Sequence, residues 1–381
     1  MSSPSLPQPA ALASGIDLVP VSFASLDGWE GDDHFAAFDT FCRSAEQYLS
    51  SPYRSGLVGI DPASFANCAE HALTLHRQIE HSSSESKRHT AREFFENRFT
   101  PHRIEEQPPS PGFVTGYYEP ELAASLQKTE EFTVPLYRRP DDLVDVDNHN
   151  RPDDMDPAFQ FGRSLDGVIS PYFDRGEIQR GALEGRGLEI AWLKDKTDAF
   201  FVHVQGSARL TFQDGQKMRI GFAAKNGYPY SSLGKIVCEA SDIPASQMTA
   251  DRLTTWMRAH PDTLDGLMAR NRSYIFFKQL DHPAVEDIGP VGAAKVALTP
   301  GRSLAVDKQV HQYGLPVWVT ASRDLLDEGS NFSRLMVAQD TGSAIVGAQR
   351  GDIFVGSGSE AGHIAGRIRD QAEFTFLVPV T

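Results

Sequence analysis

Two aspartates near the C-terminus stand in surroundings that suit acid–base chemistry. Asp340 follows the mostly apolar run 336–339 and precedes a Thr-Gly pair, and Asp352 stands between Gly351 and the apolar run 353–355. Short apolar runs bounded by glycine are typical of buried strands joined by tight turns, and glycine lets the backbone turn sharply. We therefore expect both carboxylates at strand ends, and we expect the catalytic acid here if the chain is an enzyme.

Each aspartate also has other interpretations. Asp beside Gly commonly accepts backbone hydrogen bonds in a turn, which is a purely structural role. Asp340-Thr341-Gly342 is also the triplet of aspartic proteases, whose chemistry needs two acids that share a proton. The sequence has no second Asp-Thr-Gly or Asp-Ser-Gly, so only a dimeric protease stays open. A glycan hydrolase that uses Asp340 and Asp352 as base and acid is a further alternative, and a non-catalytic wall-binding module is another.

The elements that would position these acids change in type along the chain. Residues 1–20 are expected to be a flexible leader, and helical spacing of apolar residues predicts helices over 32–49, from Asp61-Pro62 onward, and over 89–99. Short strand-like runs follow at 113–118, 132–137, 188–193, 199–205, 208–212 and 218–222. A polar helix is expected over 249–260, and further strands at 274–278, 294–298, 303–307, 317–320 and 373–379. This pattern favours a mainly β fold with a helical N-terminal part.

Composition narrows the classes of function. The chain has 381 residues, of which 40% are hydrophobic and 23% charged, with a net charge of −15. Such an acidic chain is not expected to bind nucleic acid.

Cys68 and His71 form a single pair of possible metal ligands, without a second pair to match it, so we expect no metal site and no cofactor. Cys42, Cys68 and Cys238 leave open one disulfide or three thiols. The first 20 residues lack the pattern of a signal peptide, and no run has the length of a membrane helix, so the sequence reads as that of a soluble protein.

Several motifs together resemble one family. They are Thr115-Gly116-Tyr117-Tyr118-Glu119-Pro120, Val204-Gln205-Gly206-Ser207, Lys225-Asn226-Gly227-Tyr228-Pro229-Tyr230, Asn271-Arg272-Ser273-Tyr274-Ile275-Phe276-Phe277 and the two Asp segments. With them the chain resembles the membrane-bound lytic transglycosylase A family, which cleaves bacterial murein. The C-terminal part also resembles the three-aspartate module, whose acids fall on Asp307, Asp340 and Asp352.

The resemblance implies a fold. It consists of a discontinuous first domain, 21–120 and 267–381, which contains a double-psi β-barrel, and an inserted β-rich second domain, 121–266. A glycan groove is expected between the two domains.

The resemblance also implies a reaction and its residues. The family cleaves the β-1,4 bond between N-acetylmuramic acid and N-acetylglucosamine and forms a 1,6-anhydro ring. Asp352 falls on the family's catalytic acid, Asp340 is expected to support it, and Asp307 to be structural. The apolar residues 353–355 would keep the Asp352 carboxyl protonated. Substrate-binding residues are expected to be Gln205, Ser207, Thr115, Gly116, Tyr117, Asn226 and Tyr230.

The expected partners and location follow from this substrate. The partners are the glycan strands of peptidoglycan and other cell-wall enzymes, the chain is expected to be a monomer, and its place is the periplasm, with association to the outer membrane. Family members often carry a lipidated Cys near the mature N-terminus, whereas the first Cys here is Cys42, inside an expected helix.

Overall fold

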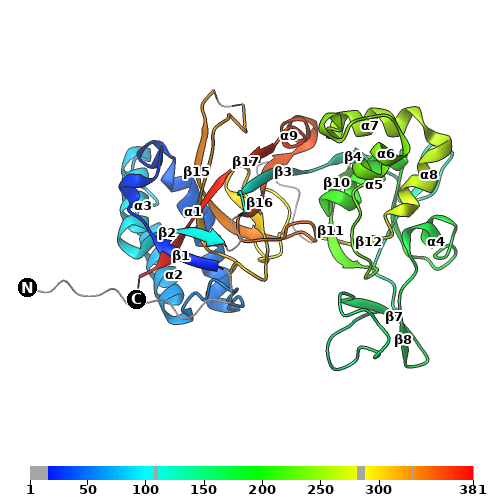
Figure 1. The fold of residues 1–381 in the computed structure, drawn as a ribbon, viewed down its shortest axis with the longest axis horizontal. Helices are drawn as coiled ribbons and strands as arrows, with labels where there is room; N and C mark the ends of the chain where they lie inside the picture. The colour runs from blue at the N-terminus through cyan, green and yellow to red at the C-terminus, as the bar shows by residue number, and fades with distance from the viewer. Residues whose placement is uncertain (1–15, 107–109, 281–287, 328, 381) are drawn as a thin grey trace, which may run out of the picture. The chain divides into compact units, whose positions relative to one another are not determined.

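The chain forms two compact units, each of which contains more than one segment (Figure 1). The computed structural model describes residues 16–106, 110–280, 288–327 and 329–380. The first unit consists of Met1–Tyr117, Val291–Gly356 and Ile368–Thr381, and the second of Tyr118–Pro290 and Ser357–Arg367. The second unit therefore continues past residue 266, where the inserted domain was expected to end. It does so because the strand Ile275–Gln279 pairs with another strand of that unit.

Three helices, drawn blue to cyan in Figure 1, form the N-terminal part of the first unit. They are α1 (His34–Ser50), α2 (Pro62–Gln78) and α3 (Ser84–Arg98). Each begins after a residue whose side chain accepts a hydrogen bond from a backbone N–H of the first turn, as helix caps do; these residues are Asp33, Asp61 and Ser83. The helices pack through an aromatic cluster of Phe38, Phe41, Phe94, Phe95 and Phe99. The three predicted helices are confirmed.

Nine strands of the first unit form one sheet in the order β1-β2-β18-β14-β15-β13-β16-β3-β17. Their bounds are β1 Ile16–Pro20, β2 Phe99–Glu106, β3 Phe113–Glu119, β13 Ser303–Val306, β14 Pro316–Ala321, β15 Phe332–Asp340, β16 Arg350–Ser357, β17 Arg369–Gln371 and β18 Glu373–Pro379. Strand β13 runs parallel to β15 and antiparallel to β16. The strands that carry the two aspartates thus flank one short, fully buried strand.

Two predictions for the first unit need correction. The leader was expected to reach residue 20, but Ile16–Pro20 forms β1, paired with β2; residues 1–15 lie outside the described part. The run 294–298 was expected to be a strand and instead forms turns with one isolated bridge, between Val291 and Ala297. The reason is local, since Lys295 has a φ of 63°, which bends the backbone away from an extended strand.

The second unit contains three small sheets and six helices among the described residues. The sheets have the orders β12-β11-β10-β4, β5-β9 and β6-β7-β8. The strands are β4 Glu121–Ala123, β5 Val134–Tyr137, β6 Leu143–Asp145, β7 Phe161–Leu165, β8 Val168–Ser170, β9 Glu189–Leu193, β10 Ser207–Thr211, β11 Lys217–Lys225 and β12 Ile275–Gln279. The helices are α4 Arg175–Gln179, α5 Lys196–Gln205, α6 Leu233–Ala240, α7 Ala250–Ala259, α8 Pro261–Arg270 and α9 Gly358–Ala365. The prediction of a mainly β chain with a helical N-terminal part is confirmed.

The run 199–205 was predicted to be a strand, and this prediction is wrong, because it lies in helix α5. Asp195 caps the helix through a 2.6 Å hydrogen bond from Thr197 N–H, and Gly206 ends it with a φ of +81°. A short apolar run fits a buried helix as well as a strand, so periodicity alone could not separate the two. The neighbouring runs 208–212 and 218–222 were predicted to be strands and are confirmed, as the antiparallel pair β10–β11.

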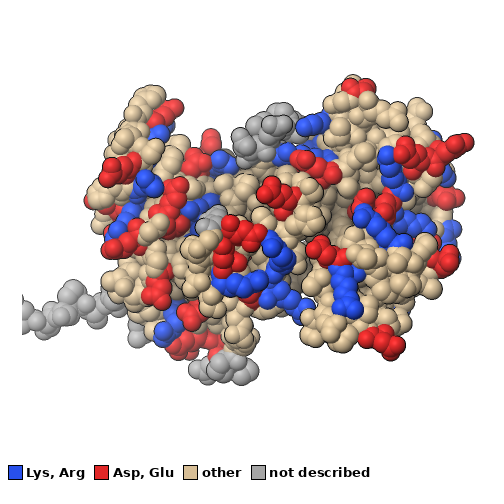
Figure 2. All heavy atoms as spheres, turned by 90° about the horizontal axis from the view of Figure 1, so that it is seen from above, with Lys and Arg blue, Asp and Glu red and all other residues tan. Residues whose placement is uncertain are grey.

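All three cysteines are free thiols, with Cys42 and Cys68 buried. Lys and Arg side chains are interspersed with Asp and Glu over the face drawn in Figure 2. Among the helices of the described residues, none combines the length and apolar composition that a membrane span needs.

Candidate functional site

Asp352 lies on β16, next to β3 in the sheet, and two neighbouring side chains hold one of its oxygens. Thr115 on β3 donates its hydroxyl to Asp352 Oδ1. The guanidinium of Arg350 lies 2.5 Å from the same Oδ1 and also donates to Thr115 Oγ1 at 2.7 Å. In the part of the chain that the structure describes, Asp352 Oδ2 has no hydrogen-bond partner. The Asp352 side chain is 19% exposed, so one oxygen is fixed and the other is available to a substrate.

The surroundings of Asp352 differ from the apolar ones that the sequence suggested. Side chains alternate between the two faces of a strand, so Ile353 points to the opposite face from Asp352. Residues two positions away share its face, and these are Arg350 on one side and Phe354 on the other. Asp352 therefore lies between a cation and an aromatic ring. Arg350 is a site residue that the sequence reasoning missed, although its position two residues before an acid on one strand is the pattern that could have indicated it.

Asp340 ends β15, and both of its oxygens are engaged. Oδ1 accepts from Ala293 N–H and Oδ2 from the Tyr117 hydroxyl, each at 3.0 Å. Burial raises the pKa of the Asp340 carboxyl, and the charge of Asp352 adds to that increase, while hydrogen bonds from Ala293, Thr341 and Tyr117 oppose it. Burial, followed by the charge of Asp340, also raises the pKa of Tyr117, so Tyr117 stays a donor. Unlike Asp352, Asp340 has its oxygens occupied by the protein itself.

Helix α1 anchors the strand that delivers Asp340. The preceding residue, Gln339, is fully buried, and its amide donates to the Thr40 carbonyl at 3.0 Å and to Ser44 Oγ at 2.8 Å. A buried amide that lost these partners would cost free energy. The N-terminal helix is therefore part of the scaffold of the site.

Asp307 makes the contacts of a structural acid. It follows β13, is 9% exposed, and accepts from Gln309 N–H and Gly347 N–H, each at 2.9 Å. These bonds tie the end of β13 to the loop that precedes β16. His311, one turn further, is 1% exposed, and its Nε2 lies 3.0 Å from the Ala348 carbonyl. It lies in the loop between β13 and β14, where it is buried.

The structure thus brings together Thr115, Gly116, Tyr117, Asp340 and Asp352 in the first unit, where Gly116 lies on β3 between its two neighbours. The other predicted binding residues lie in the second unit. Gln205 is half-buried, and its Oε1 accepts from Tyr118 N–H at 3.0 Å. Ser207 is 8% exposed at the start of β10. Tyr230 is half-buried, and burial raises its pKa.

Asn226 has a structural role, which corrects its prediction as a binding residue. Its side chain is fully buried, and its Nδ2 donates to the carbonyls of Phe173 and Arg272, each at 2.9 Å. Its Oδ1 accepts from Tyr274 N–H at 2.9 Å. With these bonds made and no exposed surface, Asn226 joins three segments of the second unit instead of presenting polar atoms to a ligand.

Comparisons with known proteins give this arrangement a family. A family model described as the MltA specific insert domain matches residues 113–278, and the 3D domain, which is of the double-psi β-barrel type, matches residues 302–378. The latter match contains Asp307, Asp340 and Asp352. The former contains Thr115 and Tyr117 as well as the motifs of the second unit.

Solved structures agree with these matches. A membrane-bound lytic murein transglycosylase from Agrobacterium tumefaciens superposes with a TM-score of 0.85 at 43% identity, over 95% of this chain and 97% of that one. The crystal structure of MltA from Neisseria gonorrhoeae superposes with a TM-score of 0.76 at 30% identity, over 98% of this chain and 96% of that one.

A curated relative gives the same result over a shorter stretch. The membrane-bound lytic murein transglycosylase A of Escherichia coli K12 is 32% identical over 259 residues, which is 66% of this chain and 61% of the relative's length. The match to the Agrobacterium structure covers nearly the whole of both chains, and the two family models cover both the acids and the insert. The chain therefore belongs to the membrane-bound lytic murein transglycosylase A family.

Proposed function

We propose that this protein is a lytic transglycosylase that cleaves the β-1,4 bond between N-acetylmuramic acid and N-acetylglucosamine in peptidoglycan, leaving a 1,6-anhydromuramic end. The observation that supports the proposal is that the protein engages the carboxylate oxygens of the two acids differently. Asp340 has both oxygens engaged by Ala293 and Tyr117, whereas Asp352 keeps Oδ2 without a partner among the described residues. Family membership supports the same assignment, since Asp352 lies within the matched 3D domain.

A single carboxyl is sufficient for this reaction. The protonated Asp352 gives its proton to the leaving glycosidic oxygen, and the resulting carboxylate then takes the proton of the sugar's own C6 hydroxyl. That hydroxyl attacks the anomeric carbon, and it is held close by the sugar ring itself, which replaces the second carboxylate that ordinary glycosidases need. A proton on Oδ2 would be the one transferred, because Thr115 and Arg350 occupy Oδ1.

The residues around Asp352 have supporting roles in this proposal. Arg350 stabilises the carboxylate that forms when the proton leaves, through a charge-assisted hydrogen bond. Thr115 links Arg350 to Asp352 and fixes the side-chain orientation. Asp340 orients Tyr117, whose ring centroid lies 5.4 Å from that of Phe354. These groups hold Asp352 in one geometry, which general acid catalysis requires.

The remaining assignments concern substrate and location. We assign hydrogen bonds to acetamido or hydroxyl groups of the glycan to Gln205, Ser207 and Tyr230, and to Thr115, Gly116 and Tyr117, with Asn226 supporting the second unit from within. The groove expected between the domains stays a prediction. The substrate places the protein in the periplasm, where we expect it to act as a monomer at the outer membrane with other cell-wall enzymes.

A hydrolase is the second candidate, and one observation favours it. Burial raises the pKa of Asp340, and the nearby charge of Asp352 adds to that increase, so the site contains a second carboxyl that interacts with Asp352, as the paired acids of inverting hydrolases do. The two reactions leave different products, because hydrolysis produces a reducing end and transglycosylation an anhydro ring. The family to which the chain belongs does not support the alternative of a dimeric aspartic protease.

The experiment is a digestion of purified murein sacculi by the parent protein and by Asp352→Asn and Asp340→Asn. We expect anhydromuropeptides from the parent, a loss of at least about 100-fold for Asp352→Asn, in line with the usual contribution of a general acid, and a smaller loss for Asp340→Asn. Anhydro products formed at the parent rate by Asp352→Asn would refute the assignment. Reducing ends in place of anhydro ends would establish the hydrolase.

A further inference from the structure

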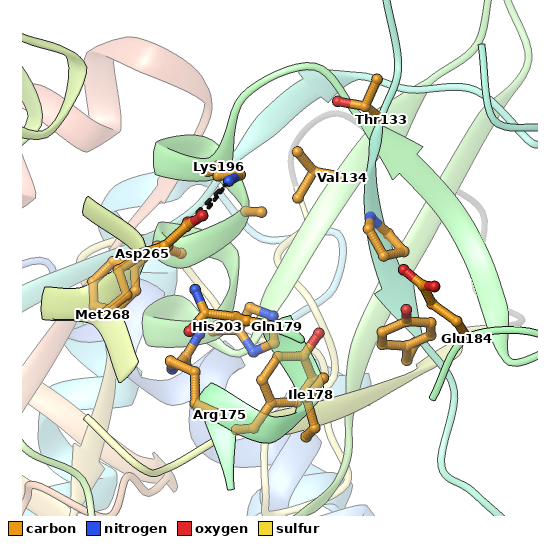
Figure 3. A pocket seen from close by; sticks show the side chains of 15 residues that line it. Thr133, Val134, Arg175, Ile178, Gln179, Glu184, Lys196, His203, Asp265 and Met268 are labelled. Atoms are coloured by element: carbon orange, nitrogen blue, oxygen red, sulfur yellow. Dashed lines mark hydrogen bonds and ion pairs between the residues drawn. The ribbon is translucent and has the colours of Figure 1, made fainter. Parts of the chain in front are cut away.

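The second unit contains a cavity formed by residues that the proposed reaction does not use (Figure 3). Its volume is about 220 Å³, and its walls come from α4, α5, α8 and β5 together with Tyr274. An apolar cavity of about 150 Å³ is large enough to hold benzene, so this one accommodates a small organic molecule. Part of its lining is apolar, with Val134, Ile178, Ala199, Phe200 and Met268.

Arg175 is a buried cation on the lining of this cavity. The residue is 5% exposed, and its Nε and Nη2 donate to the carbonyl of Ser273 at 3.0 and 2.7 Å. In the residues that the structure describes, its Nη1 has no hydrogen-bond partner and no carboxylate pairs with the guanidinium. Burial lowers the pKa of Arg175 to about 10, so the group keeps its charge at neutral pH. The guanidinium also lies 5.4 and 5.1 Å from the ring centroids of Phe200 and Tyr274, which stabilise the charge in part. A buried charge without a counterion is unfavourable, so an anion would stabilise it further.

The neighbouring polar groups are also donors. His203 Nδ1 accepts from Ile275 N–H at 3.3 Å, so the proton of the neutral ring is on Nε2, which becomes a donor. Burial, followed by the charge of Arg175, lowers the pKa of His203 well below its ordinary value, which keeps the ring neutral. The hydroxyls of Tyr137 and Tyr274, which also line the cavity, have no hydrogen-bond partner among the described residues. The buried polar groups thus suit an acceptor with negative charge.

The acids of the lining lie towards solvent. Glu184 is exposed, and Asp265 is paired with Lys196 at 2.7 Å, where both side chains are about half exposed. Figure 3 shows this Lys196–Asp265 pair and, apart from it, Arg175 and His203. The net charge of the buried part of the cavity is therefore positive, while the apolar residues leave room for a short carbon chain.

We propose that this cavity binds a small carboxylate that carries a short aliphatic group. The carboxylate would accept hydrogen bonds from Arg175 and His203, and the aliphatic part would contact Ile178 and Met268. Two sources share this chemistry, the free end of a short peptide and a simple short-chain acid. The binding site goes beyond the proposed reaction and does not depend on it.

The test is calorimetric titration of the full chain with N-acetyl-alanyl-alanine and with butyrate, using the amide of the same dipeptide as a neutral control. We expect saturable binding of at least one acid and none of the amide. Binding of the dipeptide alone would identify a peptide end, and binding of both acids a general carboxylate site. If neither acid binds the parent protein, or if the amide binds as well as the acid, the proposal is overturned.

Single-residue variants test whether the ligand binds in this cavity. Arg175→Gln is expected to abolish it, but Arg175 also holds the segment 271–273 through its bonds to the carbonyls of Asn271 and Ser273. Ala199→Met, which fills the cavity without touching that segment, should also abolish binding. Glu184→Gln removes a charge near the entrance and should tighten binding about two- to fivefold, the size of a partly exposed charge interaction. Its matched control, the exposed Glu130→Gln, and Asp352→Asn should both bind as the parent does; unchanged binding by Ala199→Met would place the ligand elsewhere.

Discussion

Replacing Glu119 by Gln should destabilise the second unit strongly, because Glu119 is a fully buried carboxylate that pairs with two buried arginines. The side chain is fully buried, and its oxygens lie 2.9 Å from Arg209 Nε and 2.8 Å from Arg219 Nε. The two arginines are 5% and 1% exposed, so solvent screens the pairs weakly. Ser357 Oγ donates to the same carboxylate at 2.8 Å. Glutamine keeps the shape and loses the charge.

The magnitude follows from this burial. Removing one partner of a buried ion pair costs about 3–5 kcal/mol, since the remaining charge stays buried without compensation. The pair between Glu121 and Arg209, at 2.9 Å, is a matched control because its carboxylate is 44% exposed. Glu121→Gln should cost at most about 1 kcal/mol. The double variant Glu119→Gln/Arg219→Gln should recover part of the loss, because the remaining Arg209 still has Glu121.

The assay is urea unfolding at pH 7, followed by tryptophan fluorescence and by circular dichroism. We expect the unfolding midpoint of Glu119→Gln to fall clearly below those of Glu121→Gln and of the double variant. The activity of Glu119→Gln should also fall, even at urea concentrations below its unfolding transition. Glu119 ends β3, the strand of Thr115, and Ser357 ends β16, the strand of Asp352. A Glu119→Gln protein within 1 kcal/mol of the parent, or a double variant that is less stable than the single one, would refute this reasoning.

Two further predictions concern the first unit. Burial lowers the pKa of His311 to about 4, below the value of about 6.5 of an unfolded histidine; stability should therefore fall as the pH drops from 6.5 to 4, by up to about 3 kcal/mol. Stability curves of the parent and of His311→Gln against pH check this, and parallel curves would contradict it. Tyr117→Phe keeps the ring beside Phe354 and removes the hydrogen bond to Asp340, so activity on sacculi should fall roughly 10-fold, the effect of about 1.4 kcal/mol. The free energy of unfolding should fall by about 1–3 kcal/mol, because Asp340 Oδ2 loses its donor. An unchanged rate would show that this bond does not position the site.

Local sequence predicted the helices of the first unit well because their signals are local. Asp61 caps α2 and Pro62 begins it, and both features can be read from two adjacent residues. The run 199–205 shows the opposite case, because its apolar residues satisfy either a buried helix or a strand. What decides for the helix is the cap at Asp195 and the turn at Gly206, together with the packing of its buried side. The end of the leader and the end of the second unit depend on pairing partners far along the chain, whereas the run 294–298 is interrupted by the local backbone bend at Lys295.

The amino-acid sequence by itself determined that the chain has a helical beginning, a β-rich remainder, and two acids next to glycine near its end, because propensity, capping and alternation act between near neighbours. Its motifs also sufficed to indicate the family. Only the tertiary structure decided which oxygen of Asp352 is engaged and that Arg350 and Thr115 are its partners. It also decided that Asn226 is buried and joins segments of the second unit through hydrogen bonds. The physical reason is that these contacts join residues up to 237 positions apart, and a hydrogen bond or an ion pair depends on distances that local sequence does not specify.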